Sequence, residues 1–392
     1  MKMDFSTTVG RDADAEVPID RVPDTTRTRW FLFGISNLGV VVVLALASWY
    51  LLADPTTSPW AFYPLPFNAA LFWAILFIVF IGFNTEFWGF DRIPQPLRGF
   101  VIICAATVFA VVVTWVLANV LGHFSPSFAA SRDGGLGYFA GALFVLFGFA
   151  TWVMVVLNWL HWPWTKLGMK QPLIGLCEIG SMMVPTLALY LVFGLPSVSE
   201  SAATSLMSVD TVLGWFYSIV VAVILTGQTL DNWPWRLFGG GGRTALASLI
   251  GNVLFGTVIY FLMVPLSKVL VGSAAVHELG GAINQFPAQI GVCWAFWMIF
   301  WANAFGNKPT GFGVAANLTV RTLVTFTLGI ATFLGYYYFA AEHILHEPMV
   351  AGALYGNALG FIDWLVLWTL FYVVGFQSFG LGALRSLEPS RG

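Results

Sequence analysis

Ionisable side chains within apolar segments are scarce in this chain, and the clearest case is Glu178. It lies about two turns into an apolar run, where a carboxylate is costly unless it binds a cation, takes up a proton or pairs with a neighbour. Glu178 therefore predicts either a transport or ion-coupling role or a hydrogen bond that serves packing. Asp363 begins a later apolar run beside Trp364, and we expect it at the membrane interface.

Aromatic turns recur along the sequence, and amides accompany them. Three turns have Trp, then Gly or Pro, then an aromatic residue, and each precedes Arg or Lys; they begin at Trp88, Trp162 and Trp233. Trp beside a base is typical of an interface anchor, and Pro ends a helix. An anchor needs no amide, so a second hypothesis is a polar lining for a solute or ion, together with Glu178. Its amides would be Asn84, Asn158, Asn232, Asn252 and Asn303.

Four of the five histidines fall in segments between apolar runs on one predicted side, and acids adjoin some of them. His343 and His346 are three residues apart, which places them on one side of a helical turn. Imidazole and carboxylate together suit a divalent transition metal such as Zn²⁺ or Cu²⁺. The alternative is scattered interfacial histidines. The predicted metal set is His123, His277, His343, His346 and Glu347.

Composition places the chain in a membrane. Of 392 residues, 58% are hydrophobic and 9% are charged, against about 25% charged residues in soluble domains. The net charge of −2 argues against binding of nucleic acid, which needs basic patches. The three cysteines form no CxxC motif, and neither a hydrolase motif nor a phosphate loop occurs, so an enzyme is not predicted.

Apolar runs of roughly 20 residues predict membrane-spanning helices. Residues 1–29 predict a disordered cytoplasmic tail, residues 30–380 the spanning domain and residues 381–392 a short cytoplasmic tail. Placing the amino terminus inside leaves only Arg132 and Lys268 outside among 17 basic residues, so both ends are predicted to be cytoplasmic, in the cell (inner) membrane. The ten predicted spans are 30–53, 67–88, 99–122, 137–160, 173–195, 212–232, 246–272, 288–305, 319–341 and 360–380.

The fold class predicted is an all-α polytopic bundle, and the spacing of the aromatic turns predicts five tandem two-helix units. Three functions remain open. The first is a permease or channel for a small solute or ion; the second is a non-transporting subunit or scaffold of a larger redox or metal complex; the third is a metal-binding membrane protein. The partners predicted are the lipid bilayer, a solute or ion, and either a second copy of the chain or a membrane-complex partner.

Overall fold

The computed structural model describes residues 24–130, 136–199, 205–350 and 354–382. Their secondary structure is helical, apart from a two-residue antiparallel pairing of β1 (Met349–Val350) with β2 (Leu354–Tyr355). Within these ranges, eight helices are long and apolar enough to cross a membrane. Such helices satisfy their backbone groups internally, as a bilayer requires. The all-helical, multi-pass membrane fold is therefore confirmed at this level.

Five helices form a closed inner ring, in which each packs against the next and the last packs against the first. Three of them continue into a π-helical turn at the carboxyl end. The inner helices are α2 (Phe67–Ile78, continued by η2, Val79–Asn84), α5 (Leu136–Leu157), α8 (Val209–Ile224, continued by η9, Leu225–Thr229), α11 (Phe286–Ala304) and α14 (Phe361–Thr369, continued by η13, Leu370–Gly375).

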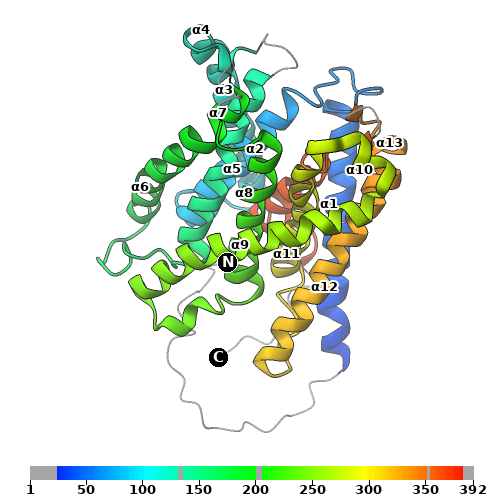
Figure 1. The fold of residues 1–392 in the computed structure, drawn as a ribbon. Coiled ribbons are helices and arrows are strands. Elements are labelled where there is room, and N and C mark those ends of the chain that lie inside the picture. The colour runs from blue at the N-terminus through cyan, green and yellow to red at the C-terminus, as the bar shows by residue number, and fades with distance from the viewer. Residues whose placement is uncertain (1–23, 131–135, 200–204, 351–353, 383–392) are drawn as a thin grey trace, which may run out of the picture.

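The other five long helices form an outer ring. Each packs against the inner helix that precedes it in the chain, and α1 closes the circle on α14. They are α1 (Asp24–Leu52), α3 (Leu97–Val116, continued by η4, Leu117–Leu121, and α4, Gly122–Phe124), α6 (Leu173–Leu189, continued by η7, Tyr190–Gly194, and α7, Leu195–Val198), α9 (Gly241–Val271) and α12 (Val314–Gly335, continued by η12, Tyr336–Ala340, and α13, Ala341–His343). Helix α9 runs obliquely across the near face in Figure 1.

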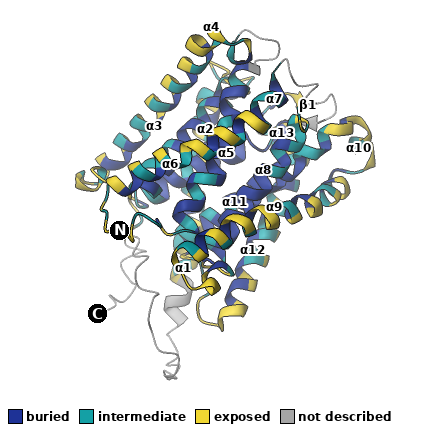
Figure 2. Ribbon diagram, turned by 60° about the vertical axis from the view of Figure 1, so that its left-hand side comes forward, coloured by how far each residue is buried: buried dark blue, intermediate teal, exposed yellow. Residues whose placement is uncertain are grey.

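The inner and outer helices differ in the share of their residues that is buried. Within the apolar windows of the five outer helices, 17–28% of residues are buried, whereas in α2, α5 and α8 the share is 56–83%. Figure 2 accordingly shows exposed residues along α3 and α6 and mostly buried ones in α8 and α11. Exposed residues of the outer ring include Val108 and Trp115 on α3 and Phe261 on α9. Such apolar side chains suit contact with lipid.

Short elements connect the long helices. They are η3 (Phe90–Arg92), η5 (Pro126–Phe128), η10 (Trp235–Phe238), α10 (Ser273–Leu279) and η11 (Gly280–Gln285). Helix α1 begins at Asp24, so the last six residues of the predicted 1–29 tail are helical. Residues 1–23 and 383–392 lie outside the described residues.

The inner helices end in a shared backbone arrangement, which we call the carboxyl-end hook. Two successive residues have φ between 50° and 62°, and the N–H of the next residue donates to the carbonyl three positions back, at 2.9–3.4 Å. Only one of the ten hook residues is glycine, although positive φ is costly for other residues. The pairs are Glu86 and Phe87, Leu160 and His161, Asp231 and Asn232, Gly306 and Asn307, and Gln377 and Ser378.

Glycines allow outer helices to approach inner ones closely. A Cβ added at Gly256 of α9 would lie 2.5 Å from the Cα of Ile219 on α8. A Cβ at Gly180 of α6 would meet nothing within 4 Å.

We therefore expect Gly256→Ala to lower the Tm of the detergent-purified protein, since the α8 backbone must shift to make room, at a cost of roughly 1–3 kcal/mol. Gly180→Ala is the matched control, because it also adds one methyl group to an outer helix but in open space. Thermal unfolding checks both variants. Equal Tm values for the two would contradict the close α8–α9 approach.

Candidate functional site

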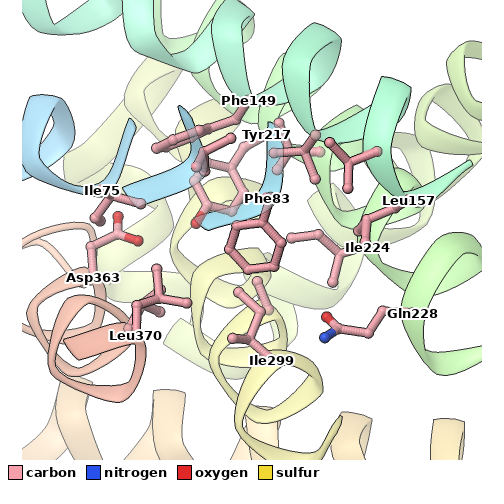
Figure 3. Close-up of a pocket in the computed structure, with 16 residues that line it drawn as sticks. Ile75, Phe83, Phe149, Leu157, Tyr217, Ile224, Gln228, Ile299, Asp363 and Leu370 are labelled. Carbon is pink, nitrogen blue, oxygen red and sulfur yellow. The ribbon is translucent and has the colours of Figure 1, made fainter. Parts of the chain in front are cut away.

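A cavity of about 70 Å³ lies on the axis of the inner ring. All 16 residues that line it belong to the five inner helices or their π-helical turns, and the outer helices contribute none of them (Figure 3). The walls are almost entirely aliphatic and aromatic. The polar side chains in the lining are Tyr217 and Gln228 from α8 and η9 and Asp363 from α14.

The lining residues fall into rings when each inner helix is counted back from the first residue of its hook. We call the residues seven positions before the hook the second apolar ring; they are Val79, Val153, Ile224, Ile299 and Leu370. The residues that lie eleven positions before the hook form the first apolar ring; they are Ile75, Phe149, Val220, Ala295 and Val366. All ten residues line the cavity, so the five helices present the same positions to one axis.

Polar groups flank the apolar rings on both sides. Tyr217 and Asp363, fourteen positions before their hooks, lie on the amino-terminal side, where the tyrosine hydroxyl donates a hydrogen bond to the carboxylate. Gln228 lies three positions before its hook on the opposite side, and Asn303 has the equivalent position in α11. In Figure 3 Phe83 is drawn between Asp363 and Gln228.

Three predicted amides form a closed network between the residue that follows α5, the α8 hook and α9. The Asn158 amide donates to the Thr226 hydroxyl and to Asn232 Oδ1, both at 3.2 Å, and Asn158 Oδ1 accepts from Asn252 at 3.1 Å. Asn252 Oδ1 in turn accepts from Thr226 at 2.9 Å and from Trp235 at 3.2 Å. These amides are buried and satisfied by one another. Such a network favours a role in joining helices.

Glu178 forms a second buried cluster, at the α2 hook. Its carboxylate is fully buried and accepts from the Asn84 amide at 2.9 Å, while its other oxygen contacts His161 Nδ1 at 2.8 Å. His161 Nε2 lies 3.8 Å from Glu86, whose side chain is 58% exposed. The cluster thus connects an outer helix to two hooks. Glu178 does not line the axial cavity, and its predicted role in binding an ion stays a prediction.

Arg321 of α12 makes a contact comparable to that of Glu178, at the α8 hook. We call such a contact, from a buried polar residue of an outer helix to the ends of inner helices, a clamp. Its guanidinium contacts Asp231 at 2.8 Å and donates twice to the carbonyl of Pro309. Outer helices α6, α9 and α12 therefore each place one buried polar residue against two successive inner-helix ends. Asn303 is different, because its amide donates only within its own helix, to Ile299 at 2.8 Å.

A third polar cluster covers the amino-terminal side of the inner ring. Glu347 Oε2 accepts hydrogen bonds from the hydroxyls of Tyr63 and Tyr336, both at 2.6 Å, and from the backbone N–H of Asn357 at 3.0 Å. Oε1 is buried without a hydrogen-bond partner. Burial raises the pKa of Glu347 to about 7, although the two hydroxyls and Asn357 act in the opposite direction.

The predicted metal ligands are dispersed. His346 Nδ1 contacts Asp54 Oδ2 at 2.8 Å, and Glu347 is engaged by tyrosines. His343 is exposed, with Nε2 3.8 Å from Glu342. His123 is exposed in α4, at the end of an outer helix, and His277 is exposed in the connecting element α10. Within the described ranges no three His, Cys, Asp or Glu side chains gather as a metal site. A divalent transition metal as cofactor stays an untested prediction.

Asp54 shows how the His346 side chain is used instead. Burial would raise the pKa of this carboxyl, but hydrogen bonds from His346 and from Thr57 and Thr56 outweigh it, so the pKa lies below the usual value. Asp54 thereby ties the end of α1 to the segment that follows α13. This contact is an anchor for the segment that carries Glu347.

No model of a known protein family, no curated protein and no solved structure matches this chain.

Sequence reasoning missed the residues at the axis. Asp363 was expected at the interface, but it is 3% exposed and lines the cavity with Tyr217. His161 was given no role, although it contacts Glu178. The sequence does contain a signal for the axial residues. When the three Trp turns are aligned, the ring residues of α2, α5 and α8 lie at equal distances before them. The amides did not supply it, since Asn84 and Asn158 share one hook position while Asn232 and Asn303 occupy two others.

Asn158→Ala should destabilise the protein strongly. The substitution leaves the Asn232 and Asn252 side chains without a shared partner, and each buried polar group left unpaired costs about 1–3 kcal/mol. Asn119→Ala is the control, because Asn119 is exposed and bonds only within its own helix. We expect a clear loss of Tm in detergent for the first variant and little change for the second. An unchanged Tm for Asn158→Ala would argue against the network.

Glu347 should make stability depend on pH. Its folded-state pKa, about 7, exceeds the ordinary value of 4.5, so the folded protein holds this proton more tightly than the unfolded chain. The stabilisation is complete below about pH 4.5 and is lost as the pH rises through 7. Between pH 5.5 and pH 8 the Tm of the wild type should fall more than that of Glu347→Gln. Parallel pH profiles would show that Glu347 is not the group responsible.

Proposed function

We propose that the chain is a channel or permease for a small solute or ion, and that the path runs along the axis of the inner ring. The observation that carries the proposal is the fivefold register of the cavity. Ten of its lining residues come from two equivalent positions on each of five helices. A packed core needs apolar side chains but has no need for equivalent positions around one axis.

The chemistry along that axis also suits permeation. Two apolar rings separate polar side chains at the two ends, Asp363 and Tyr217 on one side and Gln228 on the other. Hydrophobic constrictions of this kind gate pores because a narrow apolar passage excludes water. The cavity would then be the closed section of the path.

The same register supports ten membrane crossings and five two-helix units as the finer architecture. The eight long apolar helices do not include α11 and α14. These two helices pack into the inner ring as α2, α5 and α8 do, and they would supply the ninth and tenth crossings. The run Phe361–Gly375 has only 15 residues, or roughly 22 Å of helix, so the residues that directly flank it would have to complete the crossing. Each unit would contribute one outer and one inner helix, and the hooks would mark its repeat.

The orientation and location follow from charge. Arg92, Lys166, Arg236 and Lys308 each follow an inner-helix hook. The excess of bases on cytoplasmic segments therefore favours the hook side as cytoplasmic, with both chain ends there, in a cell membrane. The scaffold and metal-binding hypotheses have no comparable support from the described residues. A second copy or a membrane-complex partner also stays a prediction.

Ile299→Ser in the second apolar ring tests the path. A hydroxyl in this ring should let water enter the constriction, so solute flux should rise severalfold over the wild type. Proteoliposomes supply the measurement, with light scattering for urea and glycerol and fluorescent dyes for small ions. Ile250→Ser is the matched control, because Ile250 is 53% exposed on α9 and faces away from the axis.

We expect flux through Ile250→Ser to equal that of the wild type. The proposal fails if Ile299→Ser liposomes pass every probe no faster than protein-free liposomes do. It also fails if the two variants raise flux equally, because a general loss of packing would then explain the leak.

A further inference from the structure

We propose that the Asp363 end of the axial cavity binds a small ammonium-type cation, such as ammonium or methylammonium. This names a substrate class for the path and so rests on the proposed function, but binding can be measured without transport. The inference starts from a carboxylate that is almost completely buried and has one oxygen, Oδ2, without a hydrogen-bond partner.

Asp363 has no cationic partner in the described chain. Its hydrogen bond comes from the neutral Tyr217 hydroxyl, and the other titratable group that interacts with it is the Cys293 thiol, which is fully buried. Among the described residues no Lys, Arg or His forms an ion pair with it. A buried carboxylate without a partner is strongly unfavourable, so a cation in the cavity would stabilise it.

The walls select among cations. Ca²⁺ takes six to eight oxygen ligands, and Mg²⁺ keeps an octahedral shell, whereas the cavity offers few oxygens besides those of Asp363 and Tyr217. An ammonium group needs fewer acceptors and is also attracted to aromatic ring faces. Two aromatic residues, Phe149 and Tyr217, line the cavity on the Asp363 side of the second apolar ring, whereas Phe83 lies at the level of Gln228. One carboxylate beside two aromatic side chains therefore fits an ammonium-type ion better than a metal ion.

Size sets an upper limit on the ligand. A cavity needs about 10–15 Å³ of water-accessible space to hold one water-sized molecule, and this cavity provides about 70 Å³ along its whole length. Ammonium and methylammonium therefore fit, while tetraethylammonium does not. The unpartnered oxygen of Asp363 would accept a hydrogen bond from the N–H of the ion.

The test is a titration of the full-length protein in detergent with methylammonium chloride at constant ionic strength, with Tm as the readout. A ligand that binds only the folded state raises Tm with a saturating dependence on concentration. We expect such a rise for the wild type and at least a tenfold loss of apparent affinity in Asp363→Asn. Asp210→Asn is the control, because it removes a carboxylate from the first turn of α8 outside the cavity lining.

The inference is overturned if Asp363→Asn responds to methylammonium as the wild type does, or if tetraethylammonium acts equally well. If Asp363→Asn does not fold, the pH dependence of methylammonium binding to the wild type tests the inference instead. Its affinity should then fall as the pH is lowered and the carboxylate takes up a proton, and an affinity independent of pH contradicts the site. No response of the wild type to either ammonium or methylammonium also overturns it, and would leave a proton as the only ligand of Asp363.

Transport and binding can fail separately in this design. Saturable, Asp363-dependent binding without flux of any probe through wild-type or Ile299→Ser liposomes would leave the site and remove the proposed path. Flux of urea or glycerol without any effect of Asp363→Asn on methylammonium binding would leave the path and remove the cation site.

Discussion

The carboxyl ends of the five inner helices are the constraint on which the rest of the structure depends. Backbone groups near a membrane must be hydrogen-bonded within the protein. The hooks meet this need with two residues of positive φ followed by a bond to the carbonyl three positions back. Nine of the ten hook residues are not glycine, so surrounding contacts must hold an unfavourable backbone in place.

Those contacts come from the outer helices. Glu178, Asn252 and Arg321 each extend a buried polar side chain from an outer helix to inner-helix ends. Because each clamp fixes where an inner helix ends, it also fixes which residues face the axis three, seven, eleven and fourteen positions earlier. The clamps thus position the apolar-ring residues of α2, α5 and α8 without touching the cavity themselves. Polar chemistry in this protein has two separate locations, one between helices and one on the axis.

Apolar runs of suitable length predicted where the helices lie, and the recurring Trp turns predicted where inner helices end. Sequence could not separate Glu178 from Asp363, since both are isolated carboxylates near apolar segments and only helix packing decides which faces the axis. Glu178 stood out because it lies within a run, yet it pairs with Asn84 and His161. Asp363 lies beside Trp364, a typical interface residue, yet in the first turn of α14 its side chain is buried.

The most direct measurement of the central claim is the labelling of a single cysteine at Gln228, in a protein otherwise free of cysteine. Its side chain lines the cavity on the hook side of the second apolar ring. A small, charged, membrane-impermeant thiol reagent should react with Gln228→Cys, and the reaction should reduce solute flux through reconstituted protein. Complete labelling without any change in flux, or a cysteine that the reagent cannot reach from either side, would contradict an axial path.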